Sequence, residues 1–70
     1  MKLKAIRTYR GLTRNELAEM TGLKIIRIRY LEYHEDESNL GELIKGNELY
    51  KLAKALDVEP EILLSDKELI

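Results

Sequence analysis

Apolar residues recur at helical intervals in the first third of the chain. Leu3 and Ile6 stand three residues apart among basic residues, and this spacing predicts a first amphipathic helix that ends at Gly11. Thr13 and Glu16 then form the Thr-x-x-Glu pattern of a capping box, in which each side chain bonds the backbone N–H of the other residue. We therefore expect a second short helix to begin at Thr13.

A third helix is predicted after a break at Gly22, whose lack of a side chain permits positive φ. The segment that begins at Lys24 is rich in β-branched residues, which are common in strands. Its apolar positions nevertheless recur every three or four residues rather than every two, as Ile28 and Leu31 illustrate. The spacing therefore favours a helix over a strand.

The second half of the chain predicts a long loop and two further helices. Residues 34–46 lack a helical period and include the acidic run that begins at Glu35, so we expect an acidic loop there, with a turn of helix over residues 39–44 as an alternative for that part. Asn47 is expected to cap a fourth helix, because it precedes apolar residues that recur at helical intervals. Pro60 suits the first turn of a short fifth helix, where its missing N–H has no intrahelical partner.

These elements predict one all-α domain, a compact bundle of about five short helices over residues 1–65, followed by a short tail at 66–70. A chain of 70 residues buries only roughly 60% of the surface that its unfolded form exposes, so the core is expected to be thin. No cysteine is present to reinforce it. Stability must therefore come from packed helices, from dimerisation or from both.

Composition argues against several classes of function. The chain has no cysteine and one histidine, His34, so no metal or cofactor is expected. Asp36 and Glu37 are adjacent on the expected loop and no histidine–nucleophile pair exists, so we expect neither an enzyme nor a small-molecule substrate. No apolar run approaches the roughly 20 residues of a membrane span, and no signal peptide is evident. We expect a cytoplasmic protein that binds no membrane.

Charge is distributed unevenly along the chain, although the formal net charge is only −1. Residues 1–30 contain eight basic and two acidic side chains, whereas residues 31–70 contain four basic and eleven acidic ones. A chain polarised in this way suits an anionic partner that meets the basic end. A dipolar surface without any partner is the alternative explanation of the same pattern.

The second and third predicted helices have the spacing of a helix-turn-helix motif over residues 14–33. Such a motif needs a small residue where its two helices cross and a glycine in the turn, which Ala18 and Gly22 supply. Apolar residues must then fix the angle between the helices, and four fall at suitable positions: Leu17, Leu23, Ile28 and Leu31. The second helix of such a motif is the one that enters the major groove of DNA.

Residues 12–23 (LTRNELAEMTGL) and 28–32 (IRYLE) resemble the phage repressor and Cro family of helix-turn-helix regulators, the XRE type. Residues 49–58 (LYKLAKALDV) and 60–64 (PEILL) resemble the fourth and fifth helices of that family. The resemblance implies a lambda-repressor-like fold whose second and third helices form the helix-turn-helix. It also implies sequence-specific binding of double-stranded DNA by a transcriptional regulator, in the first instance a repressor.

The resemblance further implies an ion pair between Arg7 and Glu32 that locks the first helix against the third. It also implies a homodimer on DNA, because one short helix reads too few base pairs for high specificity. Apolar residues near the C-terminus are candidates for the dimer contact, although core packing and a frayed end explain them equally well: Ile62, Leu63, Leu69 and Ile70.

Candidate DNA contacts lie at the starts of the second and third helices. The resemblance implies that Thr13 and Arg14 contact phosphate. Arg27 has the forked guanidinium that bonds a guanine edge at two points, whereas Arg29 is interpreted either as a contact or as an ordinary solvated charge. The full set expected at the base edges comprises Lys24, Ile25, Ile26, Arg27, Arg29 and Tyr30.

Two departures from the family favour a competing interpretation. Ile25 and Ile26 stand where the family has polar residues; isoleucine can pack on thymine methyl groups, but adjacent isoleucines also suit a protein-binding surface. The acidic link after Glu32 is longer than is usual in the family and would repel phosphate. The alternative is a protein-interaction module on the same fold, such as an antitoxin-like or anti-repressor partner.

We interpret the aromatic residues mainly as packing residues. We expect the tyrosines to pack against other side chains rather than to stack on single-stranded nucleic acid. His34 is interpreted as a surface residue after the third helix. The tyrosines in question are Tyr9, Tyr30, Tyr33 and Tyr50.

Overall fold

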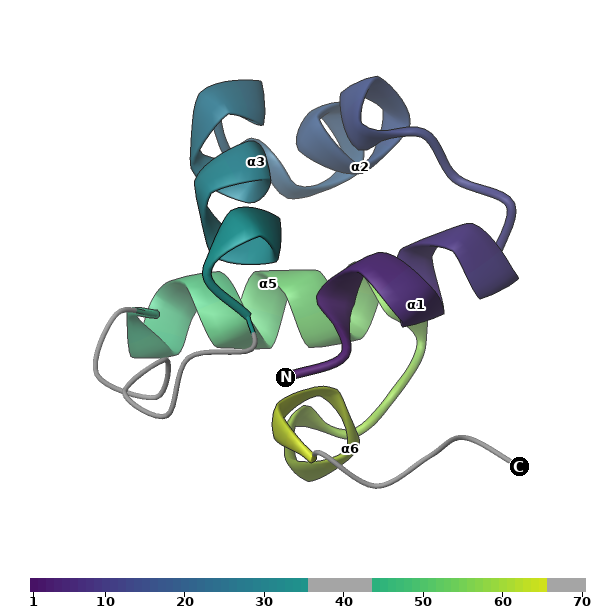
Figure 1. Ribbon diagram of the computed structural model, residues 1–70, viewed down its shortest axis with the longest axis vertical. Coiled ribbons are helices and arrows are strands. Elements are labelled where there is room, and N and C mark those ends of the chain that lie inside the picture. Colours follow the sequence, from purple (N-terminus) through teal and green to yellow (C-terminus); the bar gives the residue numbers. More distant parts are fainter. Residues whose placement is uncertain (36–43, 66–70) are drawn as a thin grey trace.

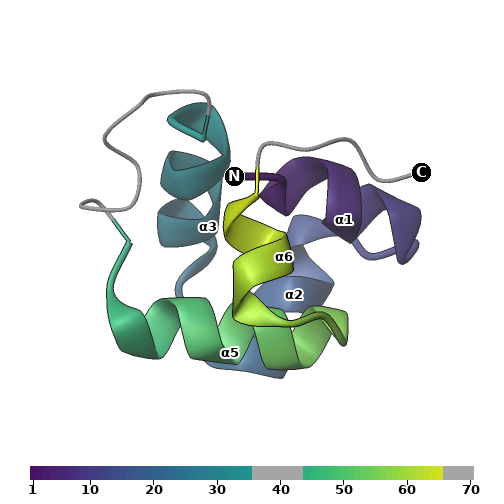
Figure 2. The ribbon, with the colours of Figure 1, turned by 90° about the horizontal axis from the view of Figure 1, so that it is seen from below.

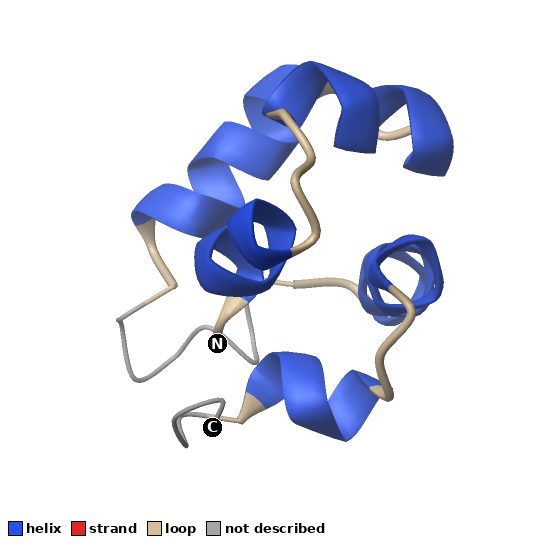
Figure 3. Ribbon diagram, turned by 90° about the vertical axis from the view of Figure 1, so that its right-hand side faces the viewer, coloured by secondary structure: helices blue, strands red, loops and turns tan. Residues whose placement is uncertain are grey.

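The computed structural model describes residues 1–35 and 44–65, and these contain five helices and no strand (Figures 1 and 3). The prediction of a compact all-α bundle is thereby confirmed, while the strand considered for the segment after Lys24 is wrong. The helices are α1 (Leu3–Tyr9), α2 (Arg14–Thr21), α3 (Ile25–Tyr33), α5 (Gly46–Leu56) and α6 (Pro60–Leu64). None of them is long and apolar enough to cross a membrane.

Helix α5 is the longest element and supports the others. In Figure 1 it runs across the middle of the molecule, with α2 and α3 on one side and α6 on the other. The view from below shows α6 running across the direction of α5, with α1 beside α6 (Figure 2). This arrangement leaves one side of α3 without a covering helix among the described residues.

The predicted capping box at the start of α2 is present. The Thr13 hydroxyl accepts a hydrogen bond of 3.0 Å from the Glu16 N–H, and the Thr13 N–H donates to the Glu16 carboxylate at 2.9 Å. Gly22 ends the helix with φ of +76°, a conformation that a residue with a side chain adopts only at a cost, and its N–H bonds the Ala18 carbonyl at 2.8 Å. Both ends of α2 are therefore set by residues that the sequence identifies.

Helix α5 begins two residues earlier than predicted, because its cap is residue 45 rather than residue 47. Asn47 is not its cap, because the helix starts at Gly46 and Lys45 takes the cap position. The Lys45 N–H donates to the Glu48 carboxylate at 2.9 Å, so the glutamate rather than the asparagine satisfies the first unpaired backbone donor. Pro60 stands in the first turn of α6, as predicted. Residues 36–43 of the expected acidic loop and the tail at 66–70 lie outside the described residues.

The core brings together the apolar faces of all five helices. Burying eight large aliphatic side chains completely supplies most of the driving force for such a small domain. Leu63 is one of them, so it packs inside the protein and is not available for the dimer contact considered above. The eight are Leu3, Ile6, Leu17, Ile28, Leu31, Leu52, Leu56 and Leu63.

The tyrosines do not pack in the core, although the Tyr30 and Tyr33 rings contact the His34 ring. Tyr9 is 79% exposed and Tyr33 is 83% exposed, and Tyr30 and Tyr50 are also exposed. Each helix buries only a few side chains, and the apolar ones among them are aliphatic. Tyr9 and Tyr33 are each the last residue of their helix, beyond the packed turns. The tyrosine rings consequently belong to the surface.

Candidate functional site

The uncovered side of α3 carries apolar and aromatic side chains. Ile28 and Leu31 point into the core, so residues on the opposite side of the helix face solvent. Ile26 is 71% exposed, and Ile25 and Tyr30 are more than one-third exposed. Of the predicted contact residues, Lys24 precedes the helix in extended conformation and is also exposed.

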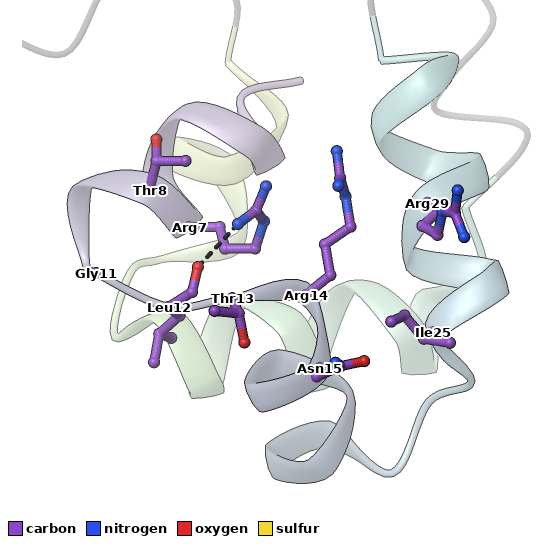
Figure 4. A pocket seen from close by; sticks show the side chains of 9 residues that line it. All are labelled: Arg7, Thr8, Gly11, Leu12, Thr13, Arg14, Asn15, Ile25 and Arg29. Carbon is purple, nitrogen blue, oxygen red and sulfur yellow. Dashed lines mark hydrogen bonds between the residues drawn. The ribbon is translucent and has the colours of Figure 1, made fainter.

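A groove lined by basic side chains runs between α1 and α3, past the start of α2. We call it the basic groove and define it by two hollows that share Arg14 and Arg29. Lys4, Tyr30 and Tyr33 help to line one of them. The other is also lined by Thr8, Thr13, Asn15 and Ile25, and Figure 4 shows the Arg14 side chain extending from α2 between α1 and α3.

Glu32 is the carboxylate that lines the basic groove, and two arginines neutralise it. Its Oε2 lies 2.6 Å from Arg7 Nε and its Oε1 lies 3.0 Å from Arg14 Nε. Arg7 also donates from Nη1 to the Leu12 carbonyl at 2.8 Å (Figure 4). The Glu32 side chain is 3% exposed and that of Arg14 is 40% exposed, so the carboxylate is hidden and a guanidinium faces the groove.

Arg27 is bound to another helix. Its Nε donates to Glu48 Oε2 at 2.7 Å and its Nη2 donates to Glu48 Oε1 at 2.9 Å, which joins α3 to the first turn of α5. The hydrogen bond from Arg27 holds the pKa of Glu48 below its ordinary value, and the same bond raises the pKa of Arg27. The Arg27 guanidinium also lies 5.1 Å from the centre of the Tyr30 ring. A guanine edge could meet only those N–H groups of Arg27 that Glu48 does not occupy.

The structure brings together some predicted residues and separates others. Arg14, Arg29, Thr13, Ile25, Ile26 and Tyr30 line the basic groove, whereas Arg27 lies on the other flank of α3. Sequence reasoning missed Lys4 and Tyr33 as lining residues. Lys4 had a usable signal, because it is a basic residue off the apolar line of α1. Glu48 had none, because its partner is 21 residues away in sequence.

Comparisons of the chain with protein families, with curated proteins and with solved structures return no match. In the described parts of the chain, no group of three or more histidine, cysteine or acidic side chains is placed to hold a metal ion. Function must therefore be argued from the charge and exposure of the basic groove and of α3.

Proposed function

We propose that this protein binds double-stranded DNA, with α2 and α3 acting as a helix-turn-helix and α3 entering the major groove. The observation that carries the proposal is the basic groove beside the uncovered side of α3. Lys4, Arg14 and Arg29 line it, and Glu32, the carboxylate among its lining residues, is buried and paired. A DNA backbone placed there meets cations without meeting an exposed carboxylate from the lining residues.

The dimensions and chemistry of α3 suit this role. The helix has nine residues, or about 14 Å of length at the usual rise, and the major groove admits an α-helix. Phosphates contacted by Arg14 and Arg29 would fix its register, while Ile26 and Tyr30 meet the base edges. Isoleucine makes its best contact with the methyl group of thymine, so the readout is expected to favour thymine-containing sites.

The wider biological role follows from the same proposal and from the resemblance to phage repressors and Cro proteins. We propose a transcriptional regulator, acting as a repressor in the cytoplasm. A helix of this length reads only a few base pairs, so two copies on a two-fold site are expected. Ile62 and Leu64 on α6 are both exposed and offer a surface for pairing.

A protein-interaction module is the second candidate function, and one observation favours it. The uncovered side of α3 exposes Ile26 and Tyr33, which are more apolar than a nucleic-acid interface requires. A partner protein would bury these side chains, and the flanking cations would then select an acidic partner. The two functions predict different affinities for duplex DNA, since only the first predicts salt-dependent binding to it.

Fluorescence anisotropy with a labelled random-sequence duplex separates the two functions. If the protein binds DNA, affinity falls steeply as salt concentration rises, because phosphate contacts release counterions. Arg29→Gln should weaken binding and reduce the slope of log affinity against log salt by about one unit. Lys51→Gln removes an exposed charge from α5 and should leave the slope unchanged. Binding that is absent at low salt, or equally sensitive to both substitutions, contradicts the proposal.

A further inference from the structure

Arg27 and Arg29 lie on opposite flanks of the uncovered side of α3. Residues two apart on an α-helix are separated by about 200° around its axis. Arg29 lines the basic groove on the α1 side, whereas Arg27 faces the first turn of α5. In Figure 2 the start of α5 lies on the same side of the molecule as α3. The two arginines therefore meet different surroundings.

Contacts other than the one with Arg27 already hold the Glu48 carboxylate in place. It lies in the first turn of α5, where the helix dipole favours a negative charge, and its Oε1 accepts the Lys45 N–H at 2.9 Å. The Glu48 side chain is 8% exposed. A buried, fixed carboxylate with two hydrogen bonds from one guanidinium is a stronger competitor for that guanidinium than a solvated anion.

We propose that Glu48 keeps Arg27 away from DNA, so that phosphate contacts are confined to the α1 side of α3. This inference rests on the proposed function and defines which flank of α3 contacts phosphate. Glu48 occupies the Nε–H and one Nη2 N–H of this guanidinium and cancels its charge, so a phosphate near the pair meets no net positive charge. Glu48 is thus a specificity-determining residue that acts through Arg27, and the flank of α3 that faces α5 presents no net charge from this pair.

The test uses amide substitutions that preserve shape while removing charge. Four proteins are compared with the labelled random-sequence duplex over a range of salt concentrations: the wild type, Glu48→Gln, Arg27→Gln and the double variant. The double variant should match the wild type within about twofold and show the same salt slope, because a neutral pair replaces a neutralised one. Glu48→Gln should bind about tenfold more tightly at low salt, with a slope about one unit steeper, because it removes the carboxylate that cancels the charge of Arg27.

Arg27→Gln should bind more weakly than the double variant, because it leaves the Glu48 carboxylate unpaired near the DNA. Glu61→Gln is the matched control, since it removes the same charge from an exposed position on α6. It should change affinity by less than about twofold. Thermal unfolding of each protein establishes that all are folded at the temperature of the binding measurement.

Two results would overturn the inference while leaving DNA binding intact. One is a double variant whose slope is about one unit shallower than that of the wild type, because Arg27 would then contact phosphate in the wild type. The other is Glu48→Gln binding no more tightly than Glu61→Gln. If none of the proteins binds duplex in a salt-dependent way, the proposed function and the inference both fail.

A second measurement needs no substitution. In the isotope-labelled wild type, the Nε–H and Nη–H resonances of the arginines are followed by nuclear magnetic resonance as duplex is added. Those of Arg27 should remain in place, while the Nη–H resonances of Arg14 and Arg29 shift on contact with DNA. A shift of any Arg27 guanidinium resonance as large as theirs would overturn the inference.

Discussion

The Nε of Arg7 lies 2.6 Å from Oε2 of Glu32, and both side chains are more than nine-tenths buried. A second bond of 3.2 Å joins Nη2 to Oε1, so the pair is bidentate. Through it α1 is held against α3, and the bond from Arg7 to the Leu12 carbonyl also holds the segment that leads into α2. This one pair thus sets the relative positions of the three helices around the basic groove.

Removing the carboxylate should therefore destabilise the whole domain. Glu32→Gln leaves the buried Arg7 guanidinium without a compensating charge, and we expect the free energy of unfolding to fall by about 3–5 kcal/mol. Unfolding in urea, followed by circular dichroism, measures the change. Arg14→Gln is the matched comparison: Arg14 is 40% exposed, so its bond to Glu32 should contribute no more than about 1 kcal/mol. Equal losses in the two variants would contradict this account.

The turn between α2 and α3 supplies the next prediction. Gly22 has φ of +76°, and a Cβ built there would meet nothing within 4 Å. Gly22→Ala should therefore cost only the strain of the left-handed conformation, roughly 1 kcal/mol, without any steric clash. Urea unfolding checks the value. A loss of several kcal/mol would mean that the turn resists the substitution for a reason other than its backbone conformation.

The sequence predicts the parts of this molecule that depend on local chemistry. The Thr13–Glu16 capping box and the positive φ of Gly22 each involve residues a few positions apart, where turn geometry leaves few alternatives. The all-α fold follows from the spacing of apolar residues, which is also a local property of the chain. Position 47 shows the limit of such local prediction, because Glu48 bonds the backbone of Lys45 and the helix begins two residues before the predicted start.

The candidate site depends instead on contacts between helices distant in sequence. Nothing near Arg27 indicates that Glu48 binds it, and the expectation that Arg27 reads guanine arose from its position and charge alone. The exposure of Tyr33 is similar, because the spacing of apolar residues does not reveal which helix side lacks a neighbour. Charge and periodicity predict which residues could contact a partner, whereas tertiary packing decides which of them stay exposed and able to do so.

Exposed Ile26 distinguishes DNA readout from protein binding. If it packs on thymine methyl groups, replacing thymine by deoxyuracil in a bound duplex should weaken wild-type binding by about fourfold per contacted methyl group. Ile26→Ala should bind thymine and deoxyuracil duplexes almost equally. Because Ile26 is 71% exposed, this substitution should leave the melting temperature nearly unchanged. Competition between the two duplexes in the anisotropy assay makes the comparison, and Tyr50→Ala on α5 is the control. A thymine preference that survives in Ile26→Ala would assign that readout to another residue.

The carboxyl group of Glu35 predicts an unusual pH dependence of stability. It lies at the start of α1, where it accepts the Lys4 N–H at 3.2 Å, and burial raises its pKa above the ordinary value. Above the ordinary Glu pKa the folded state therefore binds more protons than the unfolded state does. Stability from this group is accordingly lost as pH rises through the folded pKa, whereas Glu48, with its lowered pKa, loses stability only as pH falls below the ordinary range.

Glu35→Gln tests this directly, because glutamine accepts the same hydrogen bond and does not titrate. We expect the variant to melt at a higher temperature than the wild type at pH 7, where the wild-type carboxylate is charged and partly buried. The difference should shrink as pH falls toward the ordinary Glu value, because Glu35 then becomes protonated in the folded wild type. Circular dichroism melts over a series of pH values measure it, with Glu61→Gln as the exposed control. If Glu35→Gln is instead the less stable protein at pH 7, the attraction between the carboxylate and the start of α1 exceeds the cost of burying its charge.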